Sequence, residues 1–151
     1  MTVDCPGCEG CPAPLLASEA CAAQALVVAE REFGDPRYFA VHAVTAAAYR
    51  VQHPDTVKPH SVAVGLVVLQ GAVEQGLSGE ALQKRICWAG PLLRAHPVLL
   101  VAPEVRWALT VDEVVAARTP DEHGAAVREW AEELWTGWAA VHGRLAAALA
   151  G

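Results

Sequence analysis

The chain of 151 residues has few positively charged residues and no long apolar run. Its 11 lysines and arginines are outnumbered by 17 acidic residues, so no broad cationic surface is available for a phosphate backbone. The longest strongly apolar stretch, residues 62–69, is far shorter than the roughly 18 to 20 residues that cross a bilayer. The first residues also lack the basic and apolar regions of a secretory signal. These absences argue against nucleic-acid and membrane partners and predict a cytoplasmic location.

Signals for β-structure are absent as well, because there is no Asn-Gly hairpin turn and no sustained alternation of apolar and polar residues. A hydrophobic content of 54% excludes disorder for the bulk of the chain. The length suits one domain, which usually takes about 100 to 200 residues. We therefore predict an all-α single-domain helical bundle over residues 1–151. Residues 1–17 would form a Cys-rich metal-binding segment, and residues 18–151 the bundle.

Start and stop signals predict helices over residues 18–33, 36–53 and 59–75, and a fourth that begins at Ser78. Asp35 is a good N-cap for the second helix, and Pro36 suits its first position, where a missing N–H costs nothing. Three prolines within residues 90–103 then predict a loop or a short extended segment.

Two capping boxes, Thr110–Glu113 and Thr119–Glu122, mark helix starts in the last third of the chain. The helix predicted over residues 120–149 has a wide apolar stripe, formed by Val127, Trp130, Leu134, Trp138, Val141 and Leu145. We interpret all five tryptophans as core residues, because aromatic side chains at helical spacing usually pack against neighbours.

Four of the five cysteines fall within the first 21 residues: Cys5, Cys8, Cys11 and Cys21. In a reducing compartment, closely spaced thiols bind metal more often than they form disulfides. The Cys-x-x-Cys spacing at the start lets two thiolates bind one Zn²⁺ ion, which predicts a zinc knuckle. An iron–sulfur cluster is an alternative, because the first three cysteines match the start of a ferredoxin motif. Free or oxidised thiols are a third interpretation.

The fourth ligand of a zinc site can come from either of two residues. If the first two helices form an antiparallel hairpin, Cys21 lies opposite the end of the second helix, where His53 is found. Cys5, Cys8, Cys21 and His53 would then attach the N-terminus to the bundle. Cys11 is the alternative fourth ligand.

A polar stripe runs along the helix predicted over residues 36–53. His42, Thr45, Tyr49 and either Gln52 or His53 recur at steps of three to four residues and share one face. Such a stripe is either a satisfied structural network or the lining of a pocket with proton donors or metal ligands.

Two more histidines, His123 and His142, lie near the two ends of the predicted last helix. Because about 28 Å separates them at 1.5 Å per residue, both cannot bind the same ion. His123 lies in a first turn, where the helix dipole disfavours imidazolium, so it is either a neutral base or ligand or a solvated surface residue. The candidate catalytic residues are thus His42, Tyr49, His123 and His142.

The chain also resembles a bacterial family filed as a domain of unknown function, number 5946. The resemblance rests on the opening Cys-Pro-x-Cys, on residues 30–36, on the run from Val41 to Pro54, and on a tail with Glu122-His123 and three tryptophans. It implies that these residues occupy the family's motif positions: Cys5, Cys8, Cys21, His42, Tyr49, Gln52, His53, His123 and His142. The chain departs from the pattern at Ala46 and Ala47, where the family has Val-Asp, and at Gly65, where it has His.

Two classes of function follow. The first is a zinc-binding accessory or binding protein, whose metal site organises a helical domain for a protein or small-molecule partner. The second is a small metal-dependent enzyme with a His/Tyr-lined pocket on the helix of residues 36–53. Ligand count separates them, because four protein ligands close a structural site and three leave a catalytic one open. A zinc-dependent DNA-binding regulator is disfavoured by the acidic balance.

Overall fold

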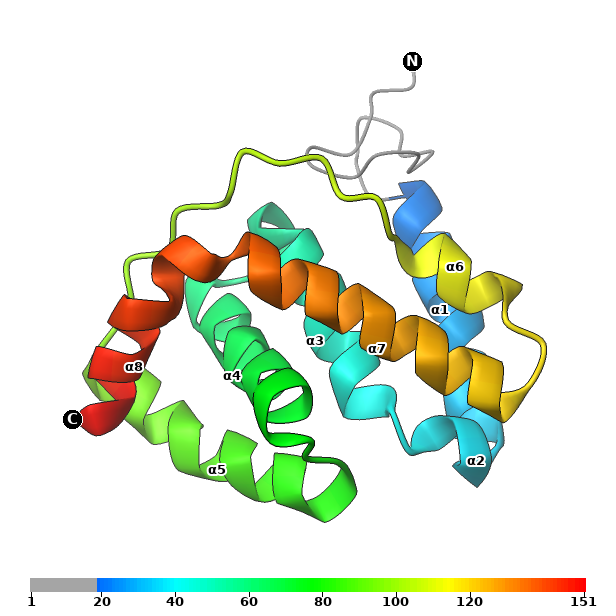
Figure 1. The fold of residues 1–151 in the computed structure, drawn as a ribbon, viewed down its shortest axis with the longest axis horizontal. Coiled ribbons are helices and arrows are strands. Elements are labelled where there is room, and N and C mark those ends of the chain that lie inside the picture. The colour runs from blue at the N-terminus through cyan, green and yellow to red at the C-terminus, as the bar shows by residue number, and fades with distance from the viewer. Residues whose placement is uncertain (1–18) are drawn as a thin grey trace.

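The computed structural model describes residues 19–151, and every regular element in this range is helical, so the predicted all-α class is confirmed. The helices are α1 (Glu19–Gly34), α2 (Pro36–Phe39), α3 (His42–Gln52), α4 (Pro59–Gln75), α5 (Gly79–Ala95), α6 (Val111–Ala116), α7 (Pro120–Gly137) and α8 (His142–Ala150), with 3-10 turns at Pro54–Thr56 and Ala139–Val141. α7 crosses α3 and α4, and α1 runs antiparallel to α3 (Figure 1). No helix in residues 19–151 is long and apolar enough to span a membrane.

The prediction of one continuous helix over residues 36–53 is wrong, because α2 ends at Phe39 and α3 begins at His42. Its start is confirmed: Asp35 is the N-cap, and its carboxylate accepts a hydrogen bond of 2.9 Å from a backbone N–H in the first turn. Val41, just before α3, departs from helical geometry with φ −106° and ψ 5°. The ring of Phe39 stacks on that of His42, with centroids 5.3 Å apart. Neither glycine nor proline marks this break, so local propensity gave no sign of it.

The loop predicted over residues 90–103 begins later than expected, because α5 continues through Pro91. Proline removes one intrahelical hydrogen bond. Burial of Ala89 and Leu93, at 0% and 3% exposure, keeps this part of α5 packed in spite of that loss. The irregular segment that follows, residues 96–110, runs along the edge of the molecule to α6 (Figure 1).

The helix predicted over residues 120–149 is also two helices, α7 and α8, separated by the 3-10 turn. His142, at the start of α8, folds back on the end of α7. Its ring stacks on Trp135 with centroids 3.6 Å apart, and its Nε2–H donates to the backbone carbonyl of Trp135 at 2.9 Å. These contacts lie where the chain changes direction between α7 and α8 (Figure 1).

Gly137, the last residue of α7, lies against the ring of Trp107. A Cβ atom at this position would be 2.3 Å from two ring carbons, far inside contact distance. We therefore expect Gly137→Ala to lower the free energy of unfolding by about 1–3 kcal/mol, because the buried indole must move. Urea denaturation followed by circular dichroism measures this change.

Gly143→Ala is the matched control for that substitution. Gly143 lies in α8, and a Cβ there would meet nothing within 4 Å. Alanine is preferred over glycine inside helices, so this variant should be as stable as the wild type or more stable. Equal effects of the two substitutions would contradict the steric argument at Trp107.

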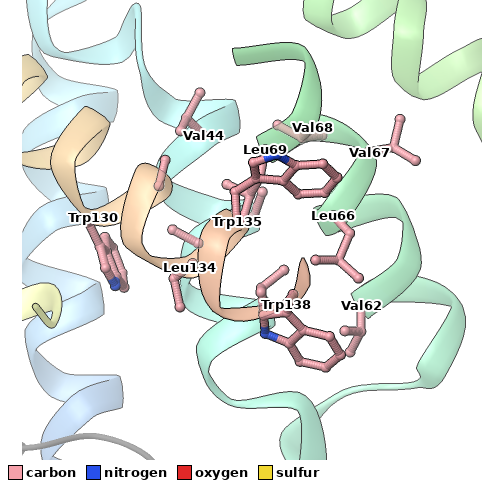
Figure 2. Packing of buried hydrophobic residues seen from close by; sticks show 14 of the residues in the cluster. Val44, Val62, Leu66, Val67, Val68, Leu69, Trp130, Leu134, Trp135 and Trp138 are labelled. Atoms are coloured by element: carbon pink, nitrogen blue, oxygen red, sulfur yellow. The ribbon is translucent and has the colours of Figure 1, made fainter. Parts of the chain in front are cut away.

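The core lies where α7 packs on α3 and α4, as Figure 2 shows for Trp130, Leu134 and Trp138. All six residues of the stripe predicted for the last helix are 1% exposed or less, which confirms that prediction. One of the five tryptophans, however, is not a core residue. Trp88 is 49% exposed, and the guanidinium of Arg85 lies 5.5 Å from its ring centroid. The interpretation of all five tryptophans as core residues is therefore wrong for Trp88.

Candidate functional site

Glu32, in the last turn of α1, is completely buried and lies among three polar side chains. The hydroxyl of Thr45 donates to Oε2 at 2.6 Å, and Nε2 of His123 lies 2.9 Å from the same oxygen. Nδ1 of His42 lies 3.0 Å from Oε1. A buried carboxylate is costly unless its oxygens are hydrogen-bonded. This cluster, built by α1, α3 and α7, therefore satisfies the acid on both oxygens.

His123 is held in one neutral form by its two partners. A guanidinium nitrogen of Arg31 lies 3.3 Å from Nδ1 of His123, and a guanidinium can only donate. Nδ1 must therefore carry the lone pair, so the proton is on Nε2 and is donated to Glu32. Arg31 also donates to the backbone carbonyls of Val114 and Val115, at 3.0 and 2.9 Å.

This geometry contradicts one of the alternatives for His123. The side chain is 0% exposed, so it is not a surface residue. Both ring nitrogens are engaged, Nδ1 with Arg31 and Nε2 with Glu32. In this arrangement His123 holds the carboxylate of Glu32 in position.

His42 differs from His123 because one of its nitrogens remains for chemistry. Its Nδ1–H donates to the carboxylate of Glu32, which leaves the lone pair on Nε2. The side chain is 28% exposed and lines a cavity. A carboxylate that fixes an imidazole in this way is the usual support for a histidine base or metal ligand.

The cavity lies between α1 and α3 and has a volume of about 430 Å³. Its lining is mainly apolar and small, and consists of Ala22, Ala25, Leu26, Ala29, Glu32, His42, Thr45, Ala46, Tyr49 and Arg50. Because the alanine side chains are small, open space remains between the two helices. The volume falls within the range of about 300–1,000 Å³ typical of small-molecule sites. A hollow of about 560 Å³ between α7 and the preceding loop is larger. It has no histidine and no buried acid in its lining, so we favour the α1–α3 cavity.

The polar stripe predicted for residues 42–53 divides into two parts. His42, Thr45 and Tyr49 line the cavity, as the pocket interpretation expects. Gln52 is 1% exposed and belongs to the core, where it donates to the carbonyl of Leu109 at 2.7 Å and accepts from a tryptophan N–H at 3.2 Å. The structural-network interpretation also describes His42 and Thr45, because both contact Glu32 while they line the cavity.

His142 does not join the other three candidate catalytic residues. It stacks on Trp135 at the turn into α8 and donates to the backbone there. His42 and Tyr49 share the cavity, and His123 reaches it only through Glu32.

The predicted metal ligands are only partly within the described residues, because Cys5, Cys8 and Cys11 lie outside them. Cys21 is 1% exposed and disulfide-bonded. The ring of His53 is buried, and its Nδ1–H donates to the carbonyl of Tyr49 at 2.9 Å. Burial lowers the pKa of His53, and this hydrogen bond opposes the shift. Within residues 21–151, no three His, Cys, Asp or Glu side chains are arranged to hold a metal ion.

Sequence reasoning missed Glu32 and Arg31, although a signal for the acid was present. Cys21, Ala25, Val28 and Glu32 follow one another at steps of three and four residues, and Cys21 and Val28 are buried. An acid in line with an apolar stripe is placed on the buried face of its helix. Its partners could not be read in the same way, because His123 is 91 positions away in sequence.

Comparison with protein families gives a match over most of the chain. The model described as "Family of unknown function (DUF5946)" matches residues 4–139. The chain belongs to this family. Within DUF5946, the matched region contains the cysteine cluster and the whole Glu32 cluster. No curated protein and no solved structure matches the chain.

Ala47 in α3 and Gly65 in α4 face each other where the two helices cross. A Cβ at Gly65 would lie 3.7 Å from Cα of Ala47 and 3.0 Å from a methyl group of Val51. Small residues at positions 47 and 65 therefore allow α3 and α4 to pack closely at their crossing.

Proposed function

We propose that this DUF5946 protein is a small enzyme that uses His42 as a general base in the α1–α3 cavity. One observation carries the proposal: His42 donates from Nδ1 to the fully buried Glu32 and lines a cavity of ligand size. This arrangement leaves the lone pair of Nε2 for a proton from water or substrate.

The chemistry that suits this site is hydrolysis of a small ester. Nε2 of His42 takes a proton from water as the water oxygen bonds to the acyl carbon. The proton then passes to the alcohol oxygen as the ester C–O bond breaks, so an acid and an alcohol leave the site. The carboxylate of Glu32 stabilises the imidazolium that forms, and Thr45 and His123 keep the carboxylate in place.

Rates of ester hydrolysis by the wild type and by His42→Asn test this proposal. A loss of rate in a variant that is still folded supports it, and an unchanged rate refutes it.

We also propose zinc binding by Cys5, Cys8, Cys21 and His53, with Cys11 as the alternative fourth ligand. Two features support it. The proton on Nδ1 of His53 is donated to a backbone carbonyl, which places the lone pair on Nε2, and its lowered pKa favours the neutral form that metals require. The site needs Cys21 in its reduced form, so the proposal includes a cytoplasmic location that keeps thiols reduced.

Metal content under reducing conditions tests the zinc site. We expect about one zinc per chain in the wild type and loss of most of it in Cys8→Ser, because the C-x-x-C pair supplies two of four ligands. Cys87→Ser is the matched control, since Cys87 is a free and exposed thiol, and it should retain the metal. Full zinc content in Cys8→Ser, or no metal in the wild type, contradicts the proposal. Iron with a brown chromophore would instead indicate an iron–sulfur cluster.

A further inference from the structure

The α1–α3 cavity has one acidic and one basic end. Glu32 and His42 form one end, and Arg50 lies in the last turn of α3 at the other. Arg50 comes eight residues after His42, which places it about 12 Å further along the helix axis. Among the described residues that line the cavity, Arg50 is the one cation.

Among the described residues, Arg50 has no structural partner that explains its position. Its side chain is exposed, and it makes no hydrogen bond or ion pair with the described residues. Most other arginines near the site are engaged, such as Arg31 with the end of α6 and Arg37 with Asp35. The guanidinium at the cavity lining is therefore available to an anion from solution.

The stretch between the two ends is apolar. Ala25, Ala29 and Ala46 line it, and Leu26 lies at its edge with 64% exposure. The exposed ring of Phe33 lies 4.6 Å from that of His42, measured between centroids, and extends the apolar surface at the acidic end. A ligand that spans the cavity thus meets a cation, an apolar wall and then the imidazole.

We infer that the substrate is an elongated carboxylic acid that carries its ester at the far end from the carboxylate. This inference rests on the proposed function, because it names the substrate class of the same site. The carboxylate binds Arg50, the apolar chain lies along the alanines, and the ester reaches His42. A single guanidinium matches a singly charged carboxylate, whereas a phosphate dianion calls for more positive charge than this lining provides. The negative charge of Glu32 also disfavours the reversed orientation.

A matched pair of probes tests the carboxylate preference on the full chain. The probes are 4-phenylbutyrate and 4-phenylbutyramide, which have the same shape and differ in charge. Isothermal titration calorimetry should show at least about tenfold tighter binding of the acid by the wild type. In Arg50→Gln the acid and the amide should bind about equally, because the guanidinium is the group that distinguishes them.

Two control variants separate the possible failures. Arg94→Gln removes another exposed arginine from the last turn of a helix, α5, and should keep the tenfold preference. His42→Asn should keep it as well, since His42 acts on the ester and not on the carboxylate.

If His42→Asn retains hydrolysis while the acid still binds through Arg50, the base assignment fails and the substrate class stands. Equal binding of acid and amide by the wild type, binding of neither, or a preference that survives in Arg50→Gln overturns the inference.

Discussion

Replacing Glu32 by alanine is expected to lower the free energy of unfolding by about 3–5 kcal/mol, because it removes the centre of a buried polar cluster. Thr45, His42 and His123 all direct donors at the two carboxylate oxygens. Without the acid, the donors of Thr45 and His123 stay buried with their main acceptor gone. The truncation also leaves a cavity where α1, α3 and α7 meet. Since domains of this size are stable by about 5–15 kcal/mol, the variant should be close to unfolding at moderate temperature.

Urea denaturation of Glu32→Ala and Glu30→Ala measures this effect against a matched control. Glu30 is an acid on the same helix, two positions away, and it is exposed. Surface substitutions usually change stability by less than about 0.5 kcal/mol, so Glu30→Ala should unfold like the wild type. Glu32→Gln, which keeps the size of the side chain and one acceptor oxygen, should fall between the two. Equal stabilities of the two alanine variants would show that the cluster does not stabilise the fold.

His42→Asn is expected to lower the rate of ester hydrolysis by about 10²- to 10⁴-fold, the usual contribution of a positioned general base. The side chain of His42 is 28% exposed, so its replacement affects the fold less than that of Glu32. Asparagine can still donate to the carboxylate of Glu32, but it cannot accept a proton at neutral pH. The substitution therefore separates the base from the structural cluster behind it.

Initial rates with p-nitrophenyl esters of short to medium acyl chains measure this loss, and thermal melts followed by circular dichroism check that the variant is folded. His96→Asn is the matched control, because His96 is an exposed histidine at the end of α5. It should keep the wild-type rate. If both variants lose the same fraction of activity, the hydrolysis comes from surface imidazoles in general and not from the cavity.

Helix starts were the part of the fold that sequence predicted best, because capping is local. The capping box of α6 is formed, because the side chain of Thr110 accepts from the backbone N–H of Glu113 and the carboxylate of Glu113 accepts from the backbone N–H of Thr110. The side chain of Thr110 also accepts from the backbone N–H of Asp112. The second predicted box is half formed. Thr119 accepts from the N–H of Glu122, but the carboxylate of Glu122 accepts from the preceding residue, Arg118.

Helix breaks were predicted less well, because their causes lie elsewhere in the chain. α7 ends where the ring of Trp107 lies against Gly137, a contact across 30 positions. α2 ends at Phe39, whose ring contacts that of Phe33 in the preceding helix. Residues 90–95 show the opposite error, since burial kept a helix going where Pro91 predicted its end. At Pro91, packing overrode local propensity.

In the candidate site, too, sequence predicted the features that depend on neighbouring residues better than those that depend on distant ones. Three-residue and four-residue spacing placed His42, Thr45 and Tyr49 on one face of a helix, and all three line the cavity. Spacing also put His123 in a first turn, where the neutral form is favoured. It could not show that His123 turns inward to Glu32, or that His142 turns away to Trp135.

The sequence by itself determined the helical class, the caps and the apolar stripe of the last helix, because these depend on neighbours within one or two turns. Only the tertiary structure decided the chemistry of the site. Glu32 meets His42 and Thr45 because the break between α2 and α3 turns the chain back along α1, and it meets His123 because α7 crosses there. A buried carboxylate needs several donors at once, and here they come from segments up to 91 positions apart. Such partners are selected by packing in three dimensions and leave no regular spacing along the chain.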